Sequence, residues 1–206
     1  MWSLLPRRLQ LFCVVIPTIV IVWAAEAVVS MAGGAETNPL KHASLVALII
    51  GGVLTPLANM FWRKLWRWFP AIERATFPDL NGTWEGDFVT TWKDPDTGTT
   101  PPPIPATVSI RQTLFSTAVS LRTGESHSHS TRCHLEADHG AQIYRIWYSY
   151  DNRPKAEVSH RSARHEGVAW LELNLSEDQD RLAGQYFTDR RTTGDMNLRR
   201  TSSSPT

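Results

Sequence analysis

Hydrophobic positions along this chain follow two different patterns that meet near residue 75. Before that point lie two long apolar runs, residues 9–31 and 43–62. At about 1.5 Å per residue, a helix over the first run spans roughly 34 Å, more than the hydrocarbon core of a bilayer at about 30 Å. We therefore predict that residues 1–75 form two transmembrane helices, joined by a short loop and followed by a linker.

The first apolar run also fits two other interpretations. Arg7 and Arg8 before it, and the small residues Ser30 and Ala32 around its end, are typical of a secretory signal peptide. The two runs could also pair as a buried helical hairpin in a soluble core. The length of the first run, and the second run that follows at once, favour two membrane helices.

Basic side chains lie at the outer ends of the two runs, namely Arg7, Arg8, Arg63, Lys64 and Arg67. The loop between the runs carries only Lys41 against Glu36. Because basic residues stay on the cytoplasmic side of a membrane, we expect both termini, and the whole chain after the second helix, to be cytoplasmic.

Glu26 is the only acidic residue within the two apolar runs. A carboxylate at membrane depth is a candidate functional group. Glu26 also lies only one helical turn from the loop, so its side chain could instead be solvated at the far membrane interface. The sequence leaves both roles open.

From Thr76 onward, apolar and polar residues alternate with the period of two that is typical of strands. Eight or nine short strands are predicted, over residues 83–92, 104–112, 115–123, 127–136, 142–152, 156–161, 169–175, 182–191 and 195–200. About 125 residues of such strands predict a small antiparallel barrel or sandwich. We expect residues 76–200 to form this domain and residues 201–206 to be a disordered tail.

Two of these strands carry unusual faces. Period two places Tyr144, Ile146, Tyr148, Tyr150 and Asn152 together on one strand, and Tyr186, Thr188, Arg190 and Thr192 together on another. Pointing inward, these faces give a barrel interior with tyrosines that stack bases, an amide that reads base edges and a guanidinium that pairs with phosphate. Pointing outward, they are a solvated surface or a surface for a protein partner.

Composition and charge divide at the same place as hydrophobicity. A chain that is 42% apolar with a mean hydropathy of −0.25 reads as an ordinary soluble protein. The part before residue 76 nevertheless carries a net charge of +4 and the rest −3. A net-acidic second part argues against binding of a nucleic-acid polymer, which requires neutralisation of many phosphates.

Neither a catalytic centre nor a metal site is indicated. There is no Gly-x-Ser-x-Gly elbow of a serine hydrolase and no glycine-rich phosphate loop. His127 and His129 share a face of one predicted strand, but His134 has the opposite parity, and His139 lies in a turn. We expect a protein that is not an enzyme and that holds no metal or cofactor.

Three short motifs follow the apolar runs in a fixed order: L-x-G-x-W-x-G at residues 80–86, Y-x-Y-x-N-x-P at 148–154 and Y-x-T-x-R-x-T-x-G at 186–194. Together they resemble the two-transmembrane, β-strand-rich effectors of CBASS antiphage signalling, also described as SMODS-associated or CD-NTase-associated membrane effectors. The resemblance covers nearly the whole chain. The His- and Ser-rich residues 126–134 have no counterpart in the family pattern, which leaves the identity of the ligand open.

This resemblance implies a membrane-anchored all-β protein, with two N-terminal transmembrane helices followed by a small antiparallel eight-stranded β-barrel. In that family the barrel is the receptor for a cyclic di- or trinucleotide made by a partner synthase. Binding promotes homo-oligomerisation and disruption of the bacterial inner membrane, which is abortive infection. Carried onto this sequence, the ligand-binding residues are Tyr148, Tyr150, Asn152, Tyr186, Thr188, Arg190 and Thr192. Trp84 is expected to close the bottom of the barrel as core.

The alternative is a membrane-anchored, lipocalin-like barrel that binds an apolar small molecule or a protein partner. Interior composition distinguishes these hypotheses, because a lipid carrier needs an interior of leucine, valine and phenylalanine. Tyrosine, asparagine, arginine and threonine favour a polar ligand. The bases, linkage and ring size of that ligand, and the number of subunits in the assembly, do not follow from the sequence.

Overall fold

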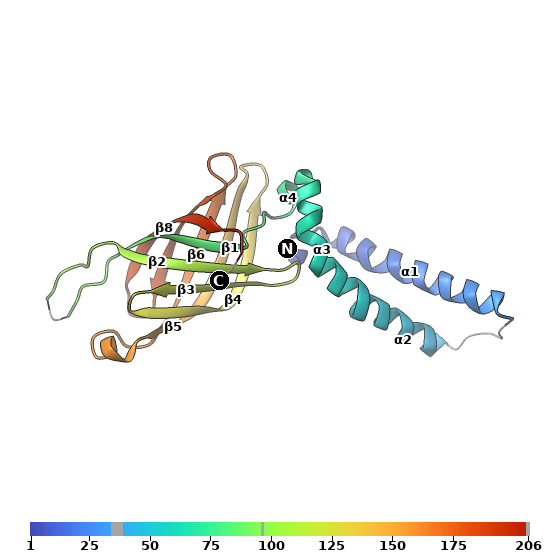
Figure 1. Ribbon diagram of the computed structural model, residues 1–206, viewed down its shortest axis with the longest axis horizontal. Coiled ribbons are helices and arrows are strands. Elements are labelled where there is room, and N and C mark those ends of the chain that lie inside the picture. The colour runs from blue at the N-terminus through green and yellow to red at the C-terminus, as the bar shows by residue number, and fades with distance from the viewer. Residues whose placement is uncertain (34–38, 96, 205–206) are drawn as a thin grey trace. The chain divides into compact units, whose positions relative to one another are not determined.

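The computed structural model describes residues 1–33, 39–95 and 97–204. The chain divides into two compact units, a helical unit over Trp2–Phe69 and a β-rich unit over Pro70–Thr206 (Figure 1). The predicted change of structure near residue 75 therefore falls at residue 70, because the short helix α4, Pro70–Ala75, belongs to the β-rich unit.

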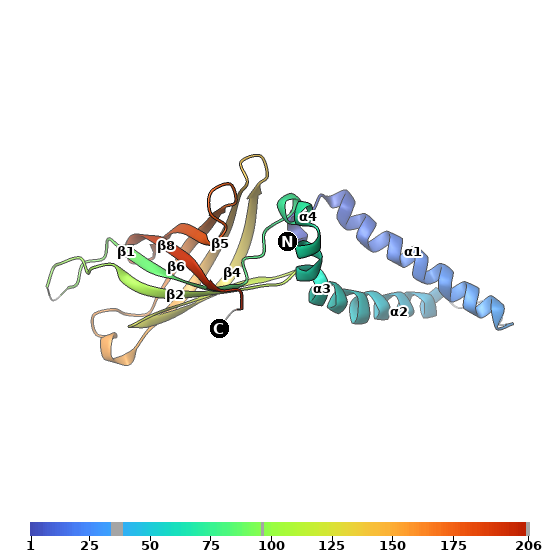
Figure 2. The same ribbon diagram turned by 45° about the horizontal axis from the view of Figure 1, so that its top comes forward.

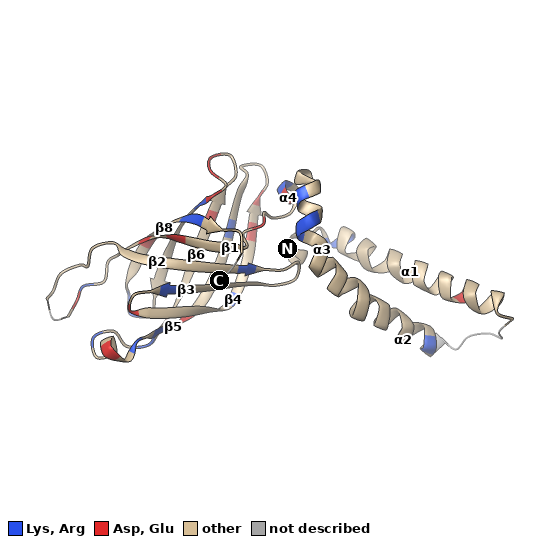
Figure 3. Cartoon of the chain, in the orientation of Figure 1, with Lys and Arg blue, Asp and Glu red and all other residues tan. Residues whose placement is uncertain are grey.

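The helical unit contains two stretches that are long and apolar enough to cross a membrane, Arg7–Met31 and Leu40–Trp68. Its elements are η1 Trp2–Leu4, α1 Arg7–Met31, α2 Pro39–Ile49, η2 Ile50–Leu54 and α3 Thr55–Trp68. Figure 3 shows little charge along α1 and α2. Among the described residues, the charged side chains there are Arg7, Arg8 and Glu26 on α1 and Lys41 on α2. The second helical stretch begins before and ends after the predicted residues 43–62.

A π-helical turn, η2, interrupts the second stretch just before Pro56. Proline has no N–H, and its ring collides with the carbonyl four residues earlier, so a regular helix cannot continue through it unchanged. Here the helical turn contains one additional residue, and the Thr55 hydroxyl donates to the Ile50 carbonyl at 2.8 Å. The Thr55 amide donates to the same Ile50 carbonyl, so this carbonyl accepts two hydrogen bonds in the widened turn before the proline.

The β-rich unit is a closed barrel of eight antiparallel strands among the described residues (Figures 1 and 2). Each strand pairs with the next, and β1 pairs with β8. The strands are β1 Gly82–Thr90, β2 Ile104–Gln112, β3 Thr117–Thr123, β4 Ser126–Asp138, β5 Ile143–Pro154, β6 His165–Asn174, β7 Arg181–Thr188 and β8 Thr193–Ser202. The predicted fold class, two apolar helices followed by an eight-stranded antiparallel barrel, is confirmed.

Several details of the predicted strands are wrong; β6, for example, begins at His165 and not at residue 169. Residues 156–161 form no strand; the short helix η3, Ala156–Val158, and a turn occupy this segment, and the Arg161 and Ser162 amides donate back to the Val158 carbonyl. β7 ends at Thr188 instead of residue 191. β8 continues to Ser202, so two residues of the predicted tail belong to this strand, and Ser202 pairs with Thr83 of β1. Residues 205–206 lie outside the described residues.

One end of the barrel is filled by side chains. Trp84 is fully buried, as expected, and its indole donates to the Leu80 carbonyl at 3.1 Å. The Arg200 guanidinium lies over the indole ring, 4.3 Å from the ring centroid. At the same end, the Tyr144 hydroxyl donates to the Arg74 carbonyl of α4 at 2.6 Å. These contacts close the end of the barrel at which the chain enters β1, so a cavity can form only toward the other end.

Candidate ligand cavity at the open end of the barrel

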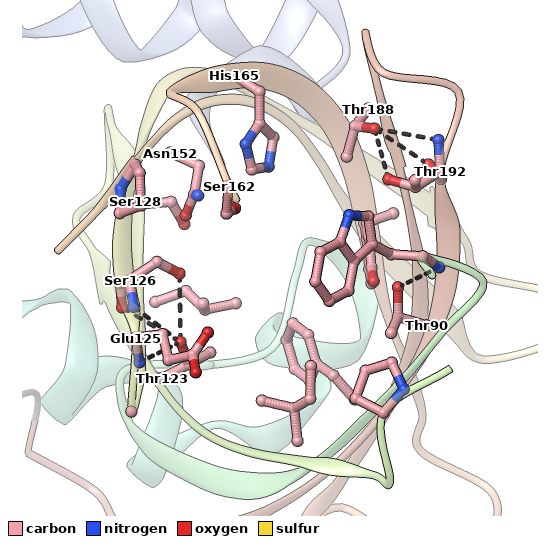
Figure 4. A pocket seen from close by; sticks show the side chains of 18 of the residues that line it. Thr90, Thr123, Glu125, Ser126, Ser128, Asn152, Ser162, His165, Thr188 and Thr192 are labelled. Carbon is pink, nitrogen blue, oxygen red and sulfur yellow. Dashed lines mark hydrogen bonds between the residues drawn. The ribbon is translucent and has the colours of Figure 1, made fainter. Parts of the chain in front are cut away.

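A cavity of about 400 Å³ occupies the end of the barrel at which β1, β3, β5 and β7 finish. Its inner part is lined by Phe88, Leu121, Tyr148 and Met196, and polar side chains surround the mouth (Figure 4). This is the size of cavity that typically holds one small molecule. The cavity faces away from the end closed by Trp84.

All seven residues predicted to bind a ligand line this cavity, namely Tyr148, Tyr150, Asn152, Tyr186, Thr188, Arg190 and Thr192. Along β5, buried and more exposed positions alternate without interruption. Tyr148, Tyr150 and Asn152 are only 4%, 8% and 7% exposed. The polar face of β5 therefore points into the barrel, which excludes the solvated interpretation of that face.

Arg190 and Thr192 reach the cavity by a different route from the predicted one. They lie in the tight turn between β7 and β8, not on a strand. The Thr188 hydroxyl lies 2.7 Å from the Thr192 hydroxyl and accepts a hydrogen bond from the Thr192 amide at 3.2 Å (Figure 4). Arg191 adopts a positive φ of 62°, which reverses the chain. Side-chain hydrogen bonds across the turn, and not strand alternation, thus set the position of Thr192.

Two of the cavity tyrosines lie over glycines on neighbouring strands. Tyr150 is paired with Gly167 on β6, and Tyr186 is paired with Gly194 on β8. A β-carbon added at Gly167 would collide with the Tyr150 ring, and one added at Gly194 would collide with the Tyr186 ring. The absence of a side chain on these glycines leaves the space that each tyrosine ring occupies.

An alanine β-carbon at Gly167 would collide with both the Tyr150 ring and the Phe187 carbonyl oxygen. Gly167→Ala is therefore expected to displace the ring and the neighbouring backbone, and to lower the free energy of unfolding by about 1–3 kcal/mol, the usual cost of overpacking. Gly124→Ala is the matched control, because a β-carbon there meets nothing within 4 Å. Thermal or chemical unfolding of the two variants measures the difference. Equal stability of the two variants would show that the glycine is not needed for the ring.

Arg190 is the cavity cation with incomplete hydrogen bonding. Its Nε is buried and has no hydrogen-bond partner among the residues that the structure describes. One terminal nitrogen donates to the Ser162 hydroxyl over a long 3.4 Å. A buried donor without an acceptor costs free energy, and an anion in the cavity would supply the acceptor.

The phenols around the cavity keep their protons. Burial raises the pKa of Tyr148 and Tyr150 above that of an ordinary tyrosine, and burial likewise raises the pKa of Tyr186. The three rings therefore present neutral aromatic faces and hydroxyl donors, without negative charge. This is compatible with an anionic ligand that carries aromatic groups.

His165, at the first residue of β6, also lines the cavity, and the sequence alone did not indicate it. Its Nδ1 lies 3.1 Å from the Ala163 carbonyl, so Nδ1 carries the proton and Nε2 is the free acceptor in the neutral ring. Burial lowers the pKa of His165 below its ordinary value, and nearby Arg190 lowers it further. Both effects favour the neutral form of the ring.

A pH dependence of stability follows from His165. Because the pKa of His165 is lower in the folded protein, the unfolded chain binds the proton more readily. The contribution of His165 to the free energy of unfolding is therefore fully present above the ordinary pKa of 6.5 and is lost as the pH falls below it. The ring is half-exposed, so we expect less than about 1 kcal/mol from this group. Comparing the unfolding of wild type and His165→Asn at pH 7.5 and 5.5 measures it. A loss that is the same in both proteins would contradict this assignment.

The lining residues that sequence reasoning missed lie partly on strands, such as Phe88, Ser128 and Met196, and partly in the connections between strands. Those in the connections are Trp92, Asp94, Pro101, Pro102, Pro103, Glu125, Val158, Arg161 and Ser162. Alternation says nothing about the direction of a loop side chain. The run of three prolines indicated a loop, but not that the loop reaches the mouth of the cavity. These loop residues could have been predicted only if it were known which loops meet at one end of the barrel.

The histidine-rich strand β4 differs from its prediction in one detail. A bulge between Ser130 and Arg132 shifts the pairing with β5, so His134 is exposed together with His127 and His129 instead of facing inward. The His127 and His129 rings contact each other with centroids 5.6 Å apart. Among the described residues, no three His, Cys, Asp or Glu side chains are grouped as a metal site would need.

Fold and cavity together define a class: barrels tethered to two membrane-length helices, with a ligand-sized cavity at one end. The family model described as "Cap15, cyclic dinucleotide receptor domain" matches residues 75–200, and the chain belongs to this family. It is also similar to "CD-NTase-associated protein 15" of Staphylococcus schleiferi, 32% identical over 93 residues. The match covers 45% of this chain and 48% of that relative, about half the length of each. The resemblance to CBASS membrane effectors is thereby confirmed.

Proposed function

We propose that this protein is a CBASS effector whose barrel binds a cyclic dinucleotide in the cavity described above. The observation that carries the proposal is Arg190, whose buried Nε has no acceptor among the described residues at the edge of a cavity lined by tyrosines. Membership of a family described as a cyclic dinucleotide receptor supports the same ligand class. The volume of about 400 Å³ favours a dinucleotide over a trinucleotide.

In this proposal the recognition tasks are divided around the cavity. Tyr148, Tyr150 and Tyr186 provide ring faces on which bases stack. Asn152 and the buried Ser128 beside it, cross-strand partners on β5 and β4, provide polar groups for base edges (Figure 4). Arg190 binds a phosphate, and Thr188 and Thr192 hold the turn that carries it.

The second part of the proposal concerns the membrane. We propose that the helices Arg7–Met31 and Leu40–Trp68 anchor the protein in the bacterial inner membrane with both termini and the barrel in the cytoplasm. Ligand binding then favours a homo-oligomer whose clustered helices disrupt the bilayer. For this to work, the ligand must bind the assembled state more tightly than the single chain, because equal affinity for both would shift nothing.

A binding screen tests the proposed function directly. The full-length protein in detergent is titrated calorimetrically with cyclic dinucleotides and cyclic trinucleotides, and with the matching linear dinucleotides as controls. We expect at least one cyclic dinucleotide to bind and its linear counterpart to bind more weakly, because a preformed ring loses less conformational freedom. Failure of every cyclic nucleotide to bind would overturn the proposal.

The inner part of the cavity supports one competing function. Phe88, Leu121 and Met196 are apolar, as in a carrier of apolar small molecules. The buried Asn152 side chain and the buried Arg190 Nε argue against this function, because an apolar ligand would leave these polar groups desolvated and unpaired. Binding of a fatty acid in place of a cyclic nucleotide would favour the carrier.

A further inference from the structure

The connection between β5 and β6, residues 155–164, lies at the mouth of the cavity and contacts three other connections there. Its backbone begins with a hydrogen bond from the Lys155 amide to the Glu125 carbonyl, at 2.8 Å. Val158 of η3 is buried, only 8% exposed, and lines the cavity. Ser162, further along, accepts the hydrogen bond from Arg190.

Arg161 joins this connection to two others. One terminal nitrogen donates to Asp94, between β1 and β2, at 3.0 Å, and the other donates to Glu125, between β3 and β4, at 2.5 Å. The side chains of Arg161 and Asp94 are only 22% and 19% exposed, so this ion pair is largely shielded from water. The Glu125 side chain is 55% exposed and contributes less.

We propose that residues 155–164 form a cap over the cavity and that Arg161 is its latch, which controls how fast a ligand enters and leaves. The inference concerns the regulation of the cavity and rests on the proposed function only for the identity of the ligand. Arg161 already has two carboxylate partners, whereas Arg190 is incompletely bonded, so a phosphate is bound by Arg190 and not by Arg161. Because Ser162 contacts Arg190, a phosphate that takes over Arg190 also loosens the cap.

The cap must open for a ligand to pass. Its internal hydrogen bonds are short-range, such as the Ser162 amide to the Val158 carbonyl at 2.9 Å, so the segment can move as a unit when the latch breaks. Loss of the latch then accelerates both association and dissociation. Affinity changes little, because the ligand contacts themselves stay in place.

Two variants of the full-length protein in detergent separate a latch from a ligand contact. Arg161→Ala removes the guanidinium, and the double variant Asp94→Asn with Glu125→Gln keeps it but removes its two carboxylate partners. For a latch, hydrogen exchange of residues 155–164 without ligand becomes about 3- to 10-fold faster in both variants. Association and dissociation rates of a cyclic dinucleotide rise by a similar factor in both.

The matched control is Arg164→Ala. Arg164 lies at the end of the same connection, but its ion pair among the described residues is with Asp151 on the adjoining strand β5 and not with another loop. We expect its exchange and binding rates to match those of the wild type.

Unchanged exchange in Arg161→Ala would overturn the proposal. It would also be overturned if the double variant bound the ligand more tightly and released it more slowly, because this would make Arg161 a direct ligand contact. Hydrogen exchange needs no ligand, so the latch is tested even if no cyclic dinucleotide binds. Failure of the latch and failure of the proposed function are thereby distinguished.

Discussion

Arg190→Ala is expected to weaken the binding of a cyclic dinucleotide to the full-length protein by about 10- to 100-fold. The lost interaction is a charge-assisted hydrogen bond to phosphate in a partly buried setting, worth about 1.5–3 kcal/mol. Within the protein, by contrast, Arg190 makes a long hydrogen bond to Ser162 and has a buried Nε without a partner among the described residues. Its removal should therefore leave the thermal stability nearly unchanged. Calorimetric titration gives the affinity, and thermal unfolding gives the stability.

Arg191→Ala is the matched control for this prediction. Arg191 is the next residue in the same turn, has the same charge and does not line the cavity. The two variants therefore change the net charge equally and differ in their access to the ligand. Equal loss of affinity in both would point to a general electrostatic effect, and unchanged affinity in Arg190→Ala would remove Arg190 from the site.

Deleting residues 2–69, the helical unit, is expected to abolish killing of the host cell while the remaining barrel still binds the ligand. The reason is that both membrane-length apolar helices are removed, and the net-acidic barrel has no comparable means of entering a bilayer. Cell viability is measured with the protein expressed beside an active cyclic-nucleotide synthase. Ligand binding is measured on the purified fragment.

Full-length Arg190→Ala provides the complementary control for the deletion. It keeps the helices and loses the proposed ligand contact, so it should fractionate with membranes and yet fail to kill. Killing by the fragment without helices would exclude disruption of the membrane by those helices. Killing by Arg190→Ala at the wild-type level would separate toxicity from ligand binding.

Strand alternation predicted the barrel well wherever both ends of a strand are marked by turn residues. On β5 the alternation continues from Tyr144 to Asn152, and the structure buries these positions as predicted. The pattern failed where alternation occurs without a sheet partner, at residues 156–161, which form η3 and a turn. It also failed at β4, where one bulge reverses the direction of every following side chain.

The cavity residues on strands could be predicted from strand alternation, but the residues at the mouth of the cavity could not. Tyr148, Tyr150 and Asn152 are fixed by the period of two on a paired strand. Arg190 lies in a turn, and the period of two placed it at the cavity only by coincidence, because the turn reverses after β7 ends at Thr188. Arg161 depends on the meeting of three loops, which no local pattern encodes. The membrane orientation and the assembly remain predictions.

A structure of the full-length protein with a cyclic dinucleotide bound tests the central claim most directly. We predict that the ligand occupies the cavity, with one phosphate within hydrogen-bond distance of the Arg190 guanidinium and its bases against the rings of Tyr148, Tyr150 or Tyr186. An empty cavity with the ligand bound elsewhere would contradict this account. A ligand in the cavity with its phosphates turned away from Arg190 would contradict it equally.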